Sequence, residues 1–196
     1  MLLLLLASSC LSPLEQSVAD EVNRLRESPS AYAAVIEHHA RHYRGKVVRL
    51  PGQTPLVTQE GIAAALEAIQ ALRQAKPAPR LEVSCGLSRA AQDHVRDQGP
   101  RGLVSHTGTD GSGPDERASR YSSAPVSAGE NISYGPRNAT RVMIELLIDD
   151  GVKGRGHRLN LLNPTSRFLG VGCGPHALHG TMCVLDFAIE FSERPQ

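Results

Sequence analysis

Two histidines and three acids that could do chemistry lie in three glycine-containing segments of the chain. They are His106 in the segment SHTG, Glu130 in GENI, and Asp149, Asp150 and His157 in DDGVKGRGH. Neutral imidazoles combined with carboxylates are the side chains of a metal site or of an acid–base site. Together they predict a divalent-cation site, for Zn²⁺ or alternatively Mg²⁺ or Ca²⁺, with His106, His157 and Glu130 as ligands.

A helix must deliver the acids of the third segment. Residues 142–148 are almost all apolar and run directly into Asp149 and Asp150, after which glycines break the helix. If Val142 and Leu146 face inward, Asp149 lies at the cleft, and if Met143 and Leu147 face inward, Asp150 does. The sequence leaves both alternatives open.

A purely structural role explains the same residues. In that interpretation Glu130 bridges backbone amides, and His157 and Asn160 fasten their loop to it, so that the motif only stabilises the fold. Two common hydrolase signatures are missing, because the chain has neither a His-Glu-x-x-His helix nor a Gly-x-Ser-x-Gly turn. We therefore assign no catalytic residue.

Length and composition indicate an ordinary globular domain. The chain has 196 residues, 40% of them hydrophobic, and a net charge of +1. The absence of a basic block argues against a nucleic-acid partner. No stretch approaches the roughly 20 apolar residues that span a bilayer.

The start of the chain indicates export. Residues 1–9 are leucine-rich and end in small residues before Cys10, which is typical of a secretion signal that lacks its basic beginning. Small residues followed by cysteine also resemble a lipobox, in which Cys10 is lipidated; an ordinary signal with an incidental cysteine is the alternative. We expect residues 1–16 to be this targeting segment. The protein would then be extracellular or in the cell envelope, attached to a membrane only through a lipid at Cys10.

Helices are expected before the site segments and strands after them. Apolar spacing predicts helices over residues 17–25, 31–42 and 58–74, followed by a proline-containing linker at 76–79. The histidines of the second helix, His38, His39 and His42, fit a solvated face better than a metal site. Residues 168–173 and 181–191 predict a long-looped β-hairpin. Helices with an antiparallel sheet make an α+β fold.

The four cysteines divide into a pair and two others. Cys173 and Cys183 lie on the two hairpin strands, where opposed residues are close enough for a disulfide in an exported protein. If Cys10 is lipidated, Cys85 remains as a buried thiol. No Cys-x-x-Cys spacing suggests a thiolate zinc site.

Several ordered motifs resemble one family. The segments SHTG, GENISYG, DDGVKGRGHRLNLLNP, GVG and MCVLDFA, spread over roughly residues 87–191, resemble the CAP superfamily of cysteine-rich secretory, antigen 5 and pathogenesis-related proteins, in its bacterial SCP-like branch. The resemblance implies an α-β-α sandwich for residues 81–196, with residues 17–80 as a helical N-terminal extension. It also implies a cleft formed by His106, Glu130, His157 and an acid at the end of the central helix. The chain departs from the family in having an aspartate there and no tryptophan.

The function that follows is binding. We expect an exported, non-enzymatic binding module whose His/acid cleft takes a divalent ion and, as the resemblance implies, a small apolar or sterol-like ligand or an extracellular partner. A metal-dependent hydrolase that uses the same cleft is the alternative. An enzyme would also need a group that stabilises an oxyanion, and the sequence does not place one.

Overall fold

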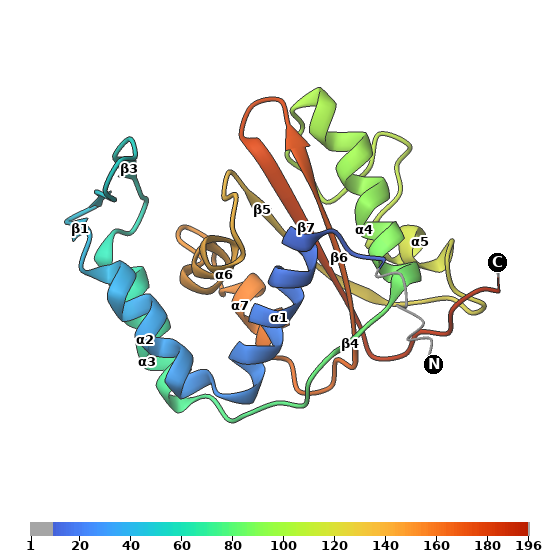
Figure 1. Cartoon of the computed structure of the whole chain (residues 1–196), viewed down its shortest axis with the longest axis horizontal. Helices are drawn as coiled ribbons and strands as arrows, with labels where there is room; N and C mark the ends of the chain where they lie inside the picture. The colour runs from blue at the N-terminus through green and yellow to red at the C-terminus, as the bar shows by residue number, and fades with distance from the viewer. Residues whose placement is uncertain (1–9, 196) are drawn as a thin grey trace, which may run out of the picture.

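A four-stranded sheet forms the centre of the structure, a computed structural model that describes residues 10–195 (Figure 1). Its strands, in spatial order, are β4 (Glu82–Val83), β6 (Phe168–His176), β7 (Gly180–Ala188) and β5 (Ala128–Tyr134). The short β4 runs parallel to β6, whereas the other two pairings are antiparallel. The predicted hairpin is therefore present as β6–β7, although its connecting turn is tighter than expected.

Both faces of this sheet are apolar and both are covered by helices. Along β7, Met182 and Val184 join one hydrophobic cluster, whereas Cys183, Leu185 and Phe187 join another. This alternation is the period of two that a strand imposes on its side chains. The α-β-α sandwich that the sequence resemblance implies is confirmed.

One helical layer packs unusually close to the sheet. It consists of α4 (Cys85–Gln98), the 3-10 turn η1 (Gly99–Arg101) and α5 (Pro114–Ser119). Gly170 and Gly172 of β6 lie directly under α4, and a Cβ on either would come within 2.4 Å or 2.6 Å of the helix backbone. Glycine at these two positions lets α4 approach the sheet closely.

The other layer is built from helices that are distant in sequence. It contains α1 (Pro13–Glu27), α6 (Ala139–Ile148) and α7 (Gly156–Leu162), with the hairpin α2 (Pro29–Ala40) and α3 (Ile62–Gln74) packed outside α6. Between α2 and α3 the chain forms a small antiparallel sheet of β1 (Tyr43–Arg44), β2 (Val47–Val48) and β3 (Leu56–Val57). In Figure 1 this small sheet stands apart from β5 and α6.

Residues 17–80, which the sequence analysis treats as an extension, share a core with the sandwich. One hydrophobic cluster contains side chains of α1, α2 and α3 together with those of α6, α7 and the central sheet. Arg26 of α1 is fully buried and donates hydrogen bonds to the carbonyl oxygens of Pro79, Leu161 and Asn163. These bonds fasten α1 both to the segment before β4 and to the end of α7.

Two disulfides are present. Cys173 and Cys183 are paired across the β6–β7 hairpin as predicted, with Cα atoms 4.1 Å apart. Cys10 is bonded to Cys85 at the start of α4, with Cα atoms 5.7 Å apart. The prediction of a free thiol at Cys85 is therefore wrong. The same bond contradicts lipidation of Cys10, because a lipidated cysteine carries its lipid on the sulfur that is used here.

The leucine-rich start on which the targeting prediction depends, residues 1–9, lies outside the described residues. Within residues 10–195, no helix is long and apolar enough to cross a membrane.

Candidate ligand-binding cleft

The first histidine of the site is held by a buried ion pair. His106 lies in the loop between η1 and α5, and its Nδ1 is 2.7 Å from Oε1 of Glu130 on β5. The other carboxylate oxygen of Glu130 accepts a hydrogen bond of 2.6 Å from Arg117 of α5, and both side chains are almost completely buried. Arg117 also donates to the carbonyl oxygens of Ser112 and His106, which fixes the loop that carries the histidine.

Contact with Glu130 favours the protonated form of His106. The hydrogen bond that His106 donates to Glu130 raises the pKa of His106 above its usual value, although partial burial opposes this shift. Because the ionised carboxylate only accepts hydrogen bonds, Nδ1 of His106 carries the hydrogen. Its Nε2 is the ring nitrogen left for another partner.

The second histidine is held in the same way. Asp149 ends α6 in the left-handed conformation, with φ 55°, and its Oδ1 lies 2.6 Å from Nδ1 of His157. Its Oδ2 accepts a hydrogen bond of 3.0 Å from the backbone N–H of His157, in the first turn of α7. A carboxylate at the start of a helix is stabilised by the free amides there. His157 therefore also has Nε2 as its remaining ring nitrogen.

The two aspartates have separate roles. Asp150 accepts hydrogen bonds from the backbone N–H groups of Gln59 and Glu60, ahead of α3. Asp149 is thus the acid that pairs with the histidine, whereas Asp150 fastens the turn after α6 to the segment between β3 and α3.

Asn131 and Asn160 fasten the loop of His157 to β5, whereas the structural interpretation assigned this to His157 and Asn160 acting on Glu130. Asn131 donates to the carbonyl oxygen of His157 at 2.9 Å, and Asn160 donates to the side-chain oxygen of Asn131, also at 2.9 Å. Within residues 10–195, the Glu130 carboxylate is hydrogen-bonded to the side chains of His106 and Arg117 and to no backbone amide. The loop is therefore held in place by amide groups, while both carboxylates are used to orient histidines.

Glu145 is a further site residue, which the sequence analysis missed. It lies on α6 one turn before Asp149 and accepts hydrogen bonds from the hydroxyl of Ser133 and the backbone N–H of Tyr134. Its side chain is exposed to solvent in the cleft, but desolvation by the surrounding protein raises its pKa to about 7. Attraction to His157 and Arg141 opposes this shift. The sequence signal was an acid inside an apolar helix, four residues before Asp149.

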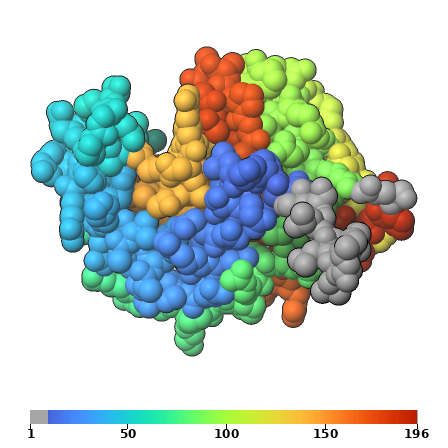
Figure 2. Space-filling view, in the orientation of Figure 1, coloured from blue at the N-terminus to red at the C-terminus, as the bar shows by residue number. Residues whose placement is uncertain are grey.

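These groups meet at one cavity of about 910 Å³. His106, Glu145, Asp149, Asp150 and His157 all line it, whereas Glu130 lies behind His106. The opposite wall comes from the small sheet, where Leu56 is 57% and Val57 is 74% exposed. Figure 2 shows a notch between the lobe that contains β3 and the part of the molecule that contains β5. The N-terminal helices and their small sheet thus complete the cleft.

Salt bridges connect α3, and the segment just before it, to the loop of His157. Arg155 forms ion pairs of 2.6 Å with both Glu60 and Glu67, and it donates to the carbonyl oxygen of Asp149 at 2.7 Å. These acids hold the pKa of Arg155 above its usual value. The two walls of the cleft are therefore linked through charged contacts as well as through the core.

The fold and the paired histidines define an α-β-α sandwich protein with a His/acid cleft. Residues 66–187 match the sequence model of the Cysteine-rich secretory protein family, CAP, so the chain belongs to this family. No match was found among curated protein sequences.

Several solved structures are similar to parts of this chain. An outer surface protein of Borrelia burgdorferi is 19% identical over 60% of this chain and 80% of its own, with a TM-score of 0.49. An extracellular SCP-domain protein of Bacillus anthracis is 23% identical over 64% of this chain but 38% of its own, with a TM-score of 0.46. A cysteine-rich secretory protein of Staphylococcus aureus is 15% identical over 66% and 38%, with a TM-score of 0.39. Membership of the family rests on the sequence match.

Proposed function

We propose that this CAP protein is an exported, non-enzymatic binding protein whose cleft holds a small ligand with an apolar body and a hydrogen-bonding group. The proposal depends on one observation: an apolar wall from the small sheet faces two histidines whose Nδ1 atoms are both paired with carboxylates. The cavity volume, about 910 Å³, is in the range of small-molecule sites.

The apolar wall supplies affinity for the body of the ligand. A ligand that covers exposed side chains such as Leu56 and Val57 removes their apolar area from water. Each Å² removed contributes about 25 cal/mol to the free energy of binding. The opposite wall supplies orientation, because Nε2 of a neutral His157 accepts a hydrogen bond from a hydroxyl. A compact apolar alcohol, such as a sterol, has both features.

Binding of a fluorescent sterol tests this proposal. Val57→Asp places a charge on the apolar wall at an exposed position and should weaken binding at least tenfold. The matched control is Leu178→Asp, since Leu178 is 76% exposed but lies in the β6–β7 turn outside the cleft. Equal affinities for the two variants, or no sterol binding by the unmodified protein, would contradict the proposal.

Export is part of the proposal. Two disulfides support it, because disulfides persist in oxidising compartments and are rare in the cytosol. Cell fractionation of the protein expressed with its own start should find it outside the cytoplasm in a soluble fraction. Retention in the cytoplasm with reduced cysteines would contradict export.

A divalent cation is the second candidate ligand. Histidines that ligate metals usually donate their other ring N–H to a carboxylate, as His106 does to Glu130 and His157 to Asp149. The fit is partial: within residues 10–195, no three His, Cys, Asp or Glu side chains are grouped as ligands of one ion. Glu130 and Asp149 would therefore orient the histidines, which would hold the ion through Nε2. The ion would supply Lewis acidity, on which the alternative of a metal-dependent hydrolase depends.

Calorimetry with Zn²⁺ at neutral pH tests the cation. His157→Ala should abolish binding, whereas His94→Ala should leave it intact, because His94 lies on the buried face of α4 and is hydrogen-bonded to the carbonyl oxygen of Ser105. If the unmodified protein binds Zn²⁺ no more tightly than His157→Ala does, the proposal of a cation as ligand should be abandoned.

A further inference from the structure

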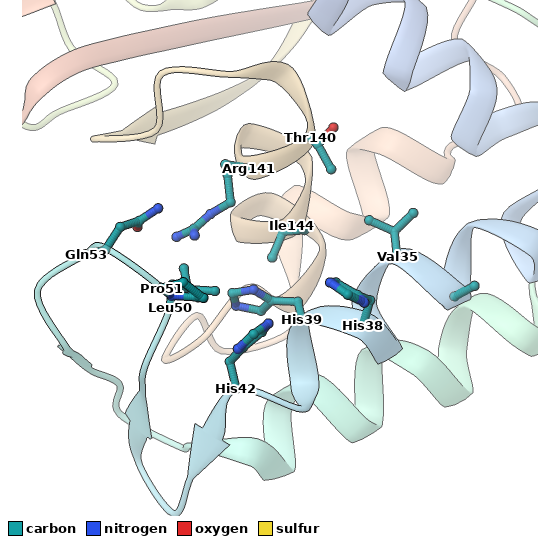
Figure 3. Close-up of a pocket in the computed structure, with 11 residues that line it drawn as sticks. Val35, His38, His39, His42, Leu50, Pro51, Gln53, Thr140, Arg141 and Ile144 are labelled. Atoms are coloured by element: carbon teal, nitrogen blue, oxygen red, sulfur yellow. The ribbon is translucent and has the colours of Figure 1, made fainter.

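A second cavity lies between α2 and α6, beside the cleft. Its volume is about 630 Å³, and Figure 3 shows the residues that line it. We call it the α2–α6 pocket. Its walls are mostly apolar, with Val35 from α2, Leu50 and Pro51 from the loop after β2, and Ile144 from α6. The cavity is therefore suited to an apolar group, and its polar residues determine which one.

The polar residues of this pocket are imidazoles, an amide, a hydroxyl and one guanidinium, without any carboxylate. His38 and His39 come from the last turn of α2, His42 from the turn that follows it, Gln53 from the loop, and Arg141 from α6. In Figure 3 the Arg141 side chain extends between Gln53 and the ring of His39. Among the described residues that line the pocket, the one fixed charge is therefore the positive charge of Arg141.

Arg141 has no anionic partner in the part of the chain that the structure describes. Its guanidinium forms no ion pair within 4 Å and no side-chain hydrogen bond among residues 10–195, although it is partly buried. Burial lowers its pKa, as expected for a charge without a close partner. Two other arginines that are shielded from solvent are paired with acids, Arg117 with Glu130 and Arg155 with Glu60. The fully buried Arg26 is instead hydrogen-bonded to carbonyl oxygens.

The acid that attracts Arg141 most strongly does not neutralise it. Glu145, one helical turn away, attracts it but is hydrogen-bonded to Ser133 and lines the cleft, not the pocket. Burial also raises the pKa of Glu145 to about 7, which weakens its ability to neutralise Arg141 at neutral pH. An anion that entered the pocket would therefore find a guanidinium with free donors.

Neighbouring histidines favour an anion over a metal ion here. The positive charge of Arg141 is one of the causes that lower the pKa of His39 to about 4, with burial as the largest. The same charge repels a cation. A neutral His39 ring retains one N–H group that can donate to an anion.

We propose that the α2–α6 pocket binds a small organic monocarboxylate, with its carboxylate on Arg141 and its apolar body against Val35, Leu50 and Ile144. A guanidinium binds a carboxylate through two parallel hydrogen bonds. One carboxylate charge matches the single fixed charge of the lining, whereas a phosphate monoester would bring a second charge without a partner. This site is separate from the cleft, although His39, Gln53, Arg141 and Ile144 form a wall common to both.

Calorimetry with 4-phenylbutyrate, and with 4-phenylbutanol as its neutral counterpart, tests the proposal. The unmodified protein should bind the carboxylate at least tenfold more tightly than the alcohol. Arg141→Gln should remove this preference while leaving the affinity for the alcohol unchanged, which also shows that the pocket is intact. Arg141→Lys should retain part of the preference, because it keeps the charge but loses the planar fork.

The matched control is Arg137→Gln. Arg137 is exposed and lines the neighbouring cleft but not the α2–α6 pocket, so the preference for the carboxylate should persist. The sterol-site variant Val57→Asp should also bind 4-phenylbutyrate normally, which separates this site from the proposed function. An unchanged preference in Arg141→Gln, equal binding of alcohol and carboxylate by the unmodified protein, or tighter binding of 4-phenylbutyl phosphate would overturn the proposal.

Discussion

The carboxylate of Asp149 contacts His157 twice. Oδ1 lies 2.6 Å from the ring nitrogen Nδ1, and Oδ2 accepts a hydrogen bond of 3.0 Å from the backbone N–H of the same residue. Asp149 itself has a φ of 55°, a conformation that aspartate and asparagine adopt more readily than other residues with a Cβ. One residue therefore ends α6, accepts a hydrogen bond from a backbone N–H in the first turn of α7, and orients a histidine of the cleft.

Asp149→Ala should be strongly destabilising. It removes two hydrogen bonds to a buried carboxylate and leaves alanine in the left-handed conformation, a loss of about 3 kcal/mol in the free energy of unfolding. Asp149→Asn keeps the conformation and one acceptor, so the loss should be about 1 kcal/mol. Urea unfolding measures both. Asp150→Ala, the neighbouring control, removes only exposed hydrogen bonds to Gln59 and Glu60 and should cost no more than about 1 kcal/mol.

Histidine titration should separate the site histidine from the buried ones. Glu130 raises the pKa of His106, so its NMR midpoint should lie above 6.5. Burial lowers the pKa of His94, and that of His39 to about 4, so both should titrate below 6.5 in the same spectra. For His106 the linked stability is fully present below the unfolded pKa, near 6.5, and is lost as pH rises through the folded value. A His106 midpoint below that of His94 would show that the Glu130 contact is absent in solution.

Sequence alone could predict the chemistry of the cleft but not how its groups pair. Histidines and acids in short glycine-containing motifs mark the site, since glycine spacing and side-chain type are local properties. The roles of Glu130 and Asp149 depend on which side chains they meet, and Arg117 reaches Glu130 only because α5 folds over β5. Glu145 was missed for the same reason: its neighbours Ser133 and Tyr134 belong to a different element.

The fold was predictable where periodicity is local. Alternation along β7 and the apolar stripe of α6 identify the sandwich, and opposed hairpin positions identify the Cys173–Cys183 bond. The pairing of Cys10 with Cys85 joins positions 75 residues apart, which no local pattern relates. Likewise, nothing in residues 43–57 shows that their small sheet forms the far wall of the cleft.

Removing the Cys10–Cys85 disulfide should cost more stability than removing Cys173–Cys183. The two bonds close loops with sequence separations of 75 and 10 residues, for which the chain-entropy relation gives about 4.5 and about 2.7 kcal/mol. Guanidinium unfolding of the double variants Cys10→Ser/Cys85→Ser and Cys173→Ser/Cys183→Ser compares them. Thiol counting on the denatured, non-reduced protein should find no free cysteine. A reactive thiol at Cys85 would restore the prediction made from sequence.

Asp186→Asn should stabilise the protein at neutral pH. Asp186 of β7 is completely buried, neither of its carboxylate oxygens has a hydrogen-bond partner within residues 10–195, and its strand neighbour is the charged Glu130. Burial first, and then the charge of Glu130, raise the pKa of Asp186 well above its usual value, while Arg117 opposes the shift. The folded protein therefore keeps this proton at pH values where the unfolded chain releases it. Stability then falls as pH rises from about 4 toward the folded pKa.

Asparagine cannot ionise, so the variant should escape this loss. We expect a gain of at least about 1 kcal/mol at pH 7, or about 2–4 °C in the melting temperature, shrinking to nothing near pH 4. Asp20→Asn makes the same change of charge on an exposed face of α1 and should shift stability by less than about 0.5 kcal/mol. Thermal unfolding of the three proteins between pH 4 and pH 8 measures the difference. If Asp186→Asn is instead less stable at pH 7, Asp186 is ionised in the folded protein, and bound water must satisfy its oxygens.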